Sequence, residues 1–126
     1  MEETTKISKK FLSAQKSMIS DKSLLLNLTG DMPLFKIIDF LLDNKGMDFS
    51  KTDIAKGAEI SRASLFNYWL ELEKHGIVKT TRSFGKTKLY TLNSKNPVTQ
   101  KIIDLEKTLI AEALEKANKK EIIVEN

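Results

Sequence analysis

Two helical segments of unequal length, joined by a turn of only three residues, constrain the fold of this chain more than any other feature of its sequence. A short extended link over residues 47–49 precedes them. The first segment begins after Ser50, whose hydroxyl can cap it, and ends at Gly57. Residues 58–60 form the turn, and the second segment, Ser61–His75, begins with a cap of its own. A short helix, a tight turn and a longer helix predict a helix-turn-helix.

Two runs of alternating residues, 77–82 and 87–92, follow the second helix directly. Alternation of this kind is typical of half-buried strands. Residues 83–86, Ser-Phe-Gly-Lys, join the runs as a hairpin loop. The sequence therefore predicts a mainly α (α+β) fold, a winged helix-turn-helix with a two-stranded β wing, with further helices at the N- and C-terminal ends.

Three segments before the helix-turn-helix have apolar patterns that predict secondary structure with different clarity. Residues 4–19 place apolar side chains on one face of a helix. Residues 24–28 are too few to assign by period, and form either a strand or a buried helical turn. A firm helix is predicted over 32–44, with Asp31 as its N-cap and Pro33 in its first turn.

The last helix is predicted from Pro97 to about Lys120, where the apolar period stops. The residues after it have neither a cap nor a period, so we expect them to fray. The predicted organisation is an N-terminal helical extension, partly flexible, over 1–30, a DNA-binding winged helix-turn-helix domain over 31–93, a C-terminal dimerisation helix over 97–120 and a frayed tail over 121–126.

The positive charge of the chain is concentrated in one block. The formal net charge is +4 over 126 residues. Residues 61–90 carry six Lys or Arg and two Glu, which gives +4, whereas residues 28–60 carry four Lys and six acids, which gives −2. A nucleic-acid face produces asymmetry of this kind, and chance fluctuation on a solvated surface is the simpler alternative.

The second helix of such a motif can enter the major groove of DNA with its N-terminal residues at the base edges. Because Leu65, Trp69 and Leu72 form its buried stripe, the residues between them face outward. Arg62 can pair with O6 and N7 of guanine, and Asn67 with N6 and N7 of adenine. The expected base-reading residues are Ser61, Arg62, Ala63, Ser64, Phe66 and Asn67.

Two members of this set have simpler alternative roles. Arg62 can be a solvated surface charge. An outward Phe66 can pack on the wing or on a partner protein instead of touching a thymine methyl group.

Contacts to the DNA backbone are expected from two places. The start of the first helix offers free backbone N–H groups, to which basic and hydroxyl side chains would add. Basic residues on a short hairpin suit phosphates or an adjacent minor groove, although lysines also protect exposed strand edges. The expected backbone-contacting residues are Ser50, Lys51 and Thr52 in the helix, and Arg82, Ser83, Lys86 and Lys88 in the wing.

Residues Phe49–Ala55, Ile60-Ser61, Leu65, Trp69 and Leu72–Val78 together resemble the winged-helix transcriptional regulators common in archaea, relatives of the MarR/ArsR-like group. The resemblance implies a homodimer that binds operator-like double-stranded DNA. It implies roles for Ser61, Arg62, Ser64 and Asn67 in the reading helix, and for Arg82 and Lys86 in the wing. The chain has no cysteine, so it lacks the thiol metal site that some ArsR relatives use.

The apolar face of the last helix is too wide for a single contact. One part can pack on the winged domain while the rest pairs with a second subunit, although the whole face can also fold onto its own domain. The predicted dimer-interface residues are Ile102, Leu105, Leu109, Ile110, Ala113 and Leu114. The helix over 4–19 is expected to pack within the dimer, with DNA contact or a membrane surface as alternatives.

Catalysis and bound cofactors find little support in the residues present. His75 is the only histidine and sits at a helix end, where a cation is favoured. The acids, Asp39, Asp43, Asp48 and Asp53 among them, have the spacing of a surface, and there is no phosphate-binding glycine loop. We expect no enzyme, no cofactor and no metal site; whether a small-molecule effector binds is left open.

Neither a secretory signal nor a membrane span is visible in the sequence, so we expect a cytoplasmic, nucleoid-associated protein with no membrane partner. Two other functions use the same elements. The winged helix can be a protein–protein interaction module, or it can bind DNA at a plasmid partition site or replication origin.

Overall fold

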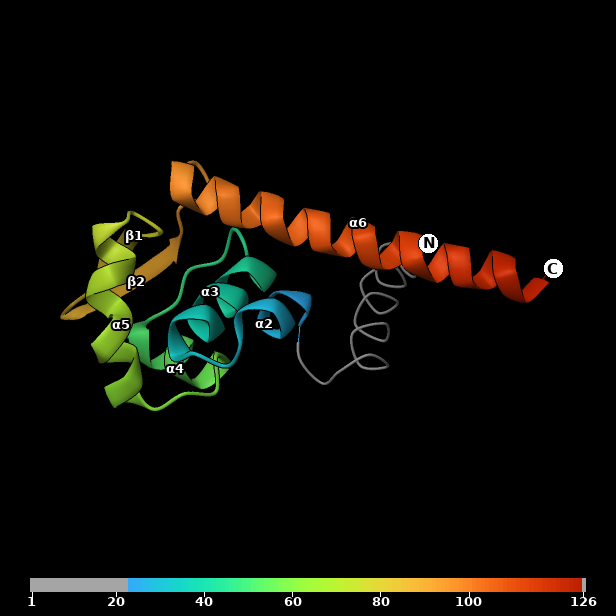
Figure 1. Ribbon diagram of the computed structural model, residues 1–126. Coiled ribbons are helices and arrows are strands. Elements are labelled where there is room, and N and C mark those ends of the chain that lie inside the picture. Colours follow the sequence, from blue (N-terminus) through green and yellow to red (C-terminus); the bar gives the residue numbers. More distant parts are fainter. Residues whose placement is uncertain (1–22, 126) are drawn as a thin grey trace, which may run out of the picture.

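The structure, a computed structural model, describes residues 23–125, with side chains described as far as residue 119. The helix predicted over 4–19 lies outside these residues. Figure 1 shows a cluster of short helices and a hairpin, from which one long helix extends. In chain order the elements are α2 (Leu24–Thr29), α3 (Pro33–Asp43), α4 (Lys51–Gly57), α5 (Arg62–Lys74), β1 (Val78–Phe84), β2 (Thr87–Leu92) and α6 (Pro97–Glu125). The predicted winged helix-turn-helix fold is confirmed.

Residues 24–28, for which the sequence allows either a strand or a buried helical turn, belong to the helix α2. The side-chain oxygen of Ser23 accepts a hydrogen bond from the backbone N–H of Leu26 at 3.1 Å, which caps its first turn. Leu25 is fully buried, and Gly30 ends the helix with a φ of 87°. Of the two alternatives, the buried helical turn is therefore the one that forms.

Helix α3 begins at Pro33, and the prediction that Asp31 is its N-cap is wrong. The N-cap is Met32, which makes no side-chain capping hydrogen bond. Proline at the first helical position explains the start, because its fixed φ suits a helix and its missing N–H has no intrahelical partner there. The apolar stripe Ile37, Ile38, Leu41 and Leu42 is buried as its period predicts.

One hydrophobic core joins α2, α3, α4, α5 and the root of the wing. Trp69 of α5 packs edge-on against Tyr90 of β2, with ring centroids 4.8 Å apart and an interplanar angle of 73°. Phe40 of α3 packs against Phe49, with centroids 5.0 Å apart. The buried apolar residues are Leu25, Ile37, Ile38, Leu41, Leu42, Ile54, Ala55, Ala58, Leu65, Trp69, Leu72, Ile77, Val78, Tyr90 and Leu92.

The wing is an antiparallel hairpin with a tighter turn than the sequence predicts. Ser83 pairs with Lys88 and Phe84 with Thr87, so Gly85 and Lys86 alone form the turn between the strands. The register shifts between Thr80 and Arg82, which marks a bulge. Four residues were expected in the loop because Ser and Gly favour turns, but Gly85, with a φ of 59°, supplies the positive φ that a two-residue turn needs.

The link before α4 adds a short third element to the sheet. Phe49 and Tyr90 exchange two backbone hydrogen bonds, each 2.8 Å long, as an isolated antiparallel bridge. This is the extended link predicted over residues 47–49. It attaches the start of the helix-turn-helix to the second strand of the wing.

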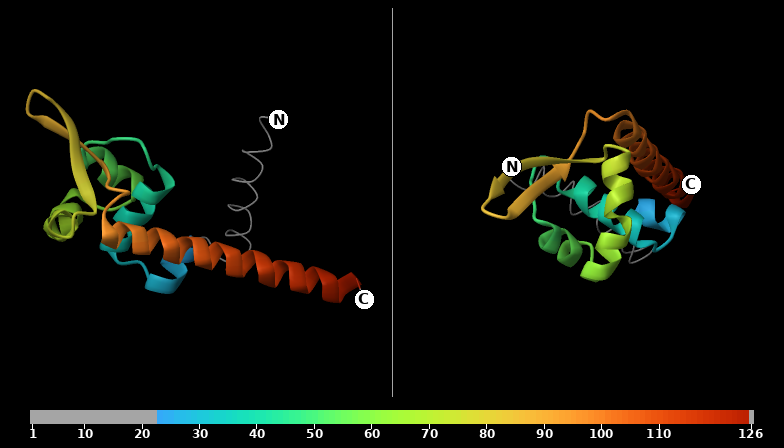
Figure 2. Two further views of the ribbon diagram at one scale, coloured as in Figure 1. Left: turned by 90° about the horizontal axis from the view of Figure 1, so that it is seen from above. Right: turned by 90° about the vertical axis from the view of Figure 1, so that its left-hand side faces the viewer.

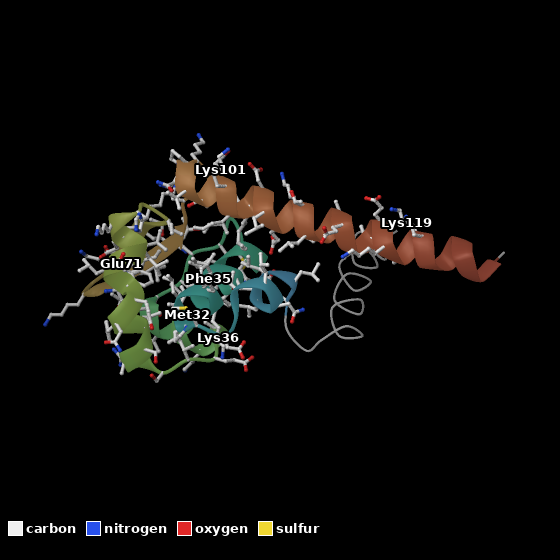
Figure 3. The ribbon with its side chains drawn as sticks, in the orientation of Figure 1. Met32, Phe35, Lys36, Glu71, Lys101 and Lys119 are labelled. Carbon is white, nitrogen blue, oxygen red and sulfur yellow. The ribbon has the colours of Figure 1, made fainter. Side chains whose placement is uncertain are left out.

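Helix α6 extends well beyond the domain and continues to Glu125, five residues past its predicted end at about Lys120 (Figure 2). The residues predicted to fray, 121–125, are helical in the structure. Near its start, Ile102 and Ile103 pack against the core, and the helix also lies against α2. Lys101 and Lys119 mark the beginning and the far part of this helix in Figure 3. Within residues 23–125 no helix is long and apolar enough to cross a membrane.

A small junction holds the end of α5, the root of the wing and the start of α6 together. Gly76 follows α5 with a φ of 71°, and its carbonyl oxygen accepts a hydrogen bond from Asn93 Nδ2 at 3.1 Å. The backbone N–H of Asn93 donates to Ile77 O at 2.7 Å. Asn96 Oδ1 accepts from the backbone N–H of Thr99 at 3.1 Å and so caps the first turn of α6.

Candidate nucleic-acid interface

Serine hydroxyls cap both helices of the helix-turn-helix. Ser50 Oγ accepts from the backbone N–H of Asp53 at 3.2 Å, and Ser61 Oγ accepts from that of Ser64 at 3.0 Å. Between the helices Glu59 takes a φ of 58°, and the N–H of Ile60 donates to Ala55 O at 3.0 Å. The tight turn therefore fixes the start of α5 relative to α4.

The outward face of α5 carries the residues predicted to read bases. Leu65, Trp69 and Leu72 are buried, as the sequence predicts. Ser61, Arg62, Ala63, Phe66 and Asn67 are exposed, and Ser64 is half-buried. The first two turns thus present a small, mostly polar face with one positive charge.

The second half of the same face has a different character. Leu70 is 71% exposed, and Glu71 and Glu73 are exposed as well. Glu71 lies on α5 in Figure 3 and is 3.6 Å from His75 Nε2. Acidic side chains repel phosphates, so this second half of α5 is less suited to a nucleic-acid backbone than the first.

Lys51, predicted to contact a phosphate, lies over three aromatic rings. Its Nζ is 5.4 Å from the ring centroid of Phe66, 5.2 Å from that of Trp69 and 5.6 Å from that of Tyr90. An ammonium group at such distances is attracted by the negative face of an aromatic ring. Lys51 therefore connects the start of α4 to α5 and to β2. No sequence signal indicates this contact, because the three rings meet only in the folded chain.

Arg82 of the wing, also predicted to contact the DNA backbone, pairs with a carboxylate of the link before α4. Its Nε donates to Asp48 Oδ2 at 3.0 Å and its second terminal nitrogen to Asp48 Oδ1 at 3.3 Å. The hydroxyl of Thr81 donates to the same Oδ2 at 2.7 Å. Hydrogen bonds from Thr81 and then Arg82 hold the pKa of Asp48 below its ordinary value of 3.8. The pair braces the wing against the link.

We expect the Asp48→Asn variant to loosen the wing at neutral pH, because the charge that Arg82 faces is lost. A carboxylate with a lowered pKa stabilises the fold above its ordinary pKa, and this stabilisation is lost as pH falls through the lowered value. Amide exchange of the β1 and β2 backbone should therefore be faster in the variant at pH 7, and the thermal stabilities of the two proteins should converge only as the pH falls below 3.8 and through the lowered pKa of Asp48. A difference that persists unchanged in acid would contradict the bracing role.

The remaining wing residues predicted to contact DNA are free of such pairing. Ser83, Lys86 and Lys88 are exposed, and the ion pairs within the described part of the chain involve neither lysine. Phe84, which the sequence prediction left out, is exposed beside them, with the Arg82 guanidinium carbon 5.3 Å from its ring centroid. The wing tip is therefore basic with one aromatic ring.

A groove of about 650 Å³ lies at the root of the wing. The link contributes Met47 and Asp48 to its wall, and β1 and the connection to α6 contribute Lys79 and Lys95. Its lining also includes the braced Asp48–Arg82 pair.

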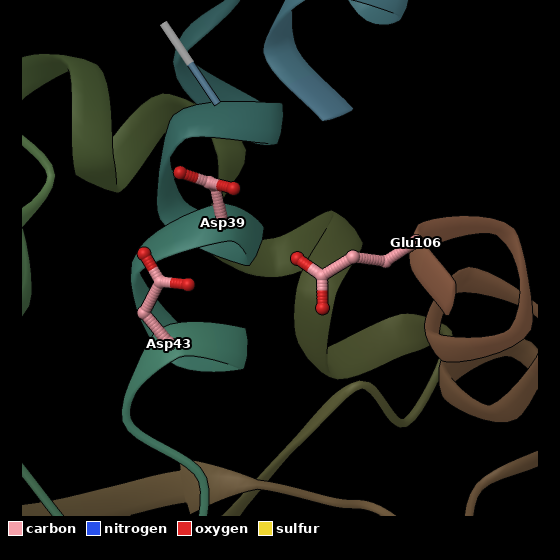
Figure 4. A group of neighbouring side chains, drawn as sticks. All are labelled: Asp39, Asp43 and Glu106. Atoms are coloured by element: carbon pink, nitrogen blue, oxygen red, sulfur yellow. The ribbon is translucent and has the colours of Figure 1, made fainter. Parts of the chain in front are cut away.

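Three carboxylates gather between α3 and α6 (Figure 4). One oxygen each of Asp39, Asp43 and Glu106 lie within 4.8 Å of one another. The sequence treats Asp39 and Asp43 as surface acids, and the approach of Glu106 depends on the packing of α6. Three carboxylates alone do not define a metal site, and we assign no ligand to them.

Comparison with known proteins gives a likeness in structure only. No protein-family model matches the chain, and no curated protein matches it in sequence. A MarR family protein from Bacillus stearothermophilus has a TM-score of 0.51 and 18% identity, with 98% of this chain and 85% of that chain covered. The apo form of a ZitR mutant from Lactococcus lactis has a TM-score of 0.52 and 18% identity, with 97% of this chain and 90% of that chain covered. NadR in complex with 4-hydroxyphenylacetate has a TM-score of 0.51 and 22% identity, with 97% of this chain and 84% of that chain covered.

These likenesses establish that the chain has the winged-helix fold found in MarR-type proteins. At such identities they concern the fold alone. The resemblance to archaeal regulators stays a prediction, as do the individual base and backbone contacts.

Proposed function

We propose that this protein binds double-stranded DNA sequence-specifically, as a homodimeric transcriptional regulator. The observation that carries the proposal is the start of α5, where Arg62 and Asn67 are exposed on a helix whose opposite face is buried. In the proposed complex these side chains face base edges in the major groove. The wing contacts the backbone or the adjacent minor groove.

Charge supports the same face. The block over residues 61–90 holds a net charge of +4, equal to that of the whole chain. Lys86 and Lys88 are exposed at the wing, next to the reading helix in the chain. A duplex approaching α5 and the wing therefore meets positive charge.

The proteins of similar fold agree with this proposal, since one of them, PA4135, is described as a transcriptional regulator and another as a MarR family protein. Their identity to this chain is too low to transfer a role by itself. The proposal therefore depends on the residues of α5 and the wing.

Dimerisation is proposed through α6. Ile102 and Ile103 pack against the core of their own domain, so the first turns of the helix are occupied. Leu105 is exposed, and α6 continues far beyond the domain. We therefore propose that the partner helix binds the outer part of the predicted set, from Leu105 through Leu109, Ile110, Ala113 and Leu114. A two-fold pair places its reading helices about 34 Å apart on one side of the duplex.

The proposal is tested by selecting a binding site from random duplex DNA and measuring the dissociation constant at two salt concentrations. If the dimer neutralises about six phosphates, raising the salt concentration from 50 to 200 mM should weaken binding by about 10³-fold. The selected site should be a palindrome. A dissociation constant that hardly changes with salt, or the absence of any selected sequence, would contradict DNA binding.

Single substitutions separate base reading from backbone contact. Arg62→Ala is expected to weaken binding to the selected site by about 1–3 kcal/mol and to relax one base position. Lys86→Ala should weaken binding to all sequences about equally, because a phosphate contact carries no sequence information. If an Arg62→Ala/Asn67→Ala double variant binds as the unmodified protein does, α5 is not the reading helix.

Exposed apolar side chains favour one alternative, a winged helix that docks a protein. Phe66 is 50% exposed and Leu70 lies one turn further along the same face. Such a surface would bind its partner with little dependence on salt and would gain nothing from duplex DNA. A partition-site or origin-binding protein would use the same DNA face, and the genomic position of the selected sites separates it from a transcriptional regulator.

A further inference from the structure

We infer that Phe66 is a positioning residue that holds Arg62 for base recognition, an inference that rests on the proposed DNA binding. Phe66 lies four residues after Arg62, so the two side chains are neighbours on the surface of α5. The guanidinium carbon of Arg62 is 5.7 Å from the centroid of the Phe66 ring. This is within the range over which a ring attracts a cation.

The Phe66 ring is itself connected to the core through a second cation. Lys51 Nζ is 5.4 Å from the centroid of Phe66 and also lies over Trp69 and Tyr90, both of which are buried. The ion pairs within residues 23–119 involve neither Lys51 nor Arg62. Aromatic contacts are therefore the interactions that hold both cations in place.

This arrangement suits an arginine that reads a base. Arginine has many rotatable bonds, and ordering them on binding costs conformational entropy. Attraction between a guanidinium group and an aromatic ring does not use the N–H donors in conventional hydrogen bonds, so they remain available for guanine O6 and N7. Phe66 thus reduces the cost of ordering Arg62 without occupying its donors.

The inference gives Phe66 a role different from those considered from the sequence. In this role its ring need not touch a thymine methyl group, and its exposure needs no protein partner. It also explains how a reading face with a single positive charge can discriminate between bases, because that charge is held in one place before DNA binds.

The test compares Phe66→Leu, which keeps an apolar side chain but removes the ring, with Phe66→Tyr, which keeps the ring. Full-length protein is titrated with the duplex selected by the unmodified protein, and with duplexes in which each base pair is changed in turn. Phe66→Leu should lower discrimination about threefold to fivefold at the base pair that Arg62→Ala relaxes. Phe66→Tyr should stay within about twofold of the unmodified protein. In the double variant Arg62→Ala/Phe66→Leu, discrimination at that base pair should fall no further than in Arg62→Ala.

Other outcomes overturn the inference. If the unmodified protein selects a duplex and Phe66→Leu leaves its base preference unchanged, or if its effect adds to that of Arg62→Ala, Phe66 does not position Arg62. If no duplex is selected, both this inference and the proposed function fail. NMR relaxation of the Arg62 side-chain N–H in the free protein provides a second measurement, since Phe66→Leu should increase its mobility, and equal mobility overturns the inference. Melting curves check that the variants fold, as a half-exposed side chain predicts.

Discussion

Replacing Trp69 with alanine is expected to lower the free energy of unfolding by about 4 kcal/mol, the range for a buried tryptophan truncated to alanine. Trp69 of α5 is 3% exposed, its ring packs edge-on against that of Tyr90 in β2, and Nζ of Lys51 in α4 lies 5.2 Å from its ring centroid. Its removal leaves a cavity between the reading helix and the wing. Urea denaturation followed by circular dichroism measures the loss.

Trp69→Phe is the matched control for this prediction. The indole Nε1 is buried and has no hydrogen-bond partner among the described residues, so phenylalanine removes an unpaired donor along with some volume. The ring that faces Tyr90 and Lys51 is kept. The phenylalanine variant should therefore lose less than about half as much stability as the alanine variant. Equal losses would show that the ring contacts contribute little.

The Gly76→Ala variant is expected to lose about 3 kcal/mol, from backbone strain and from a steric clash acting together. Gly76 has a φ of 71°, which a residue with a Cβ rarely adopts. The added Cβ would lie 2.6 Å from Asn96 Nδ2, and Asn96 is the residue that caps α6. Relief of the clash would therefore disturb the start of α6.

Gly85→Ala separates the two causes. Gly85 has a φ of 59° at the wing tip, and nothing lies within 4 Å of an added Cβ. It should lose only the strain contribution, about 1 kcal/mol. Thermal denaturation of both variants gives the comparison, and equal losses would mean that the contact with Asn96 is easily relieved.

The parts of the fold that sequence could predict are those set by local periodicity. The buried stripes of α3 and α5 follow from apolar spacing, and the serine caps of α4 and α5 follow from hydroxyls three residues before the N–H groups that they accept. The prediction of Asp31 as a cap is wrong because two local signals competed, and proline fixed the start of the helix one residue later.

The contacts that sequence could not predict join residues far apart in the chain. Arg82 faces Asp48 across 34 positions, and Lys51 meets Tyr90 only because the link pairs with β2. Charge and hydroxyl patterns in the sequence predict that Lys51 and Arg82 contact the DNA backbone. Each of them also has a partner within the protein that no pattern in the sequence reveals. The prediction for the wing relied on basic and hydroxyl side chains, so it did not include Phe84.

The junction at Gly76 has a consequence for how target sites can change during evolution. The reading helix, the wing root and α6 are fastened at one point, so in the proposed homodimer α6 acts as a rigid lever for the whole reading unit. A change of a few degrees in the crossing angle of the two α6 helices would shift the separation of the two DNA half-sites, while every base-facing residue stayed the same. Operator spacing and base preference can then diverge separately among descendants of this protein.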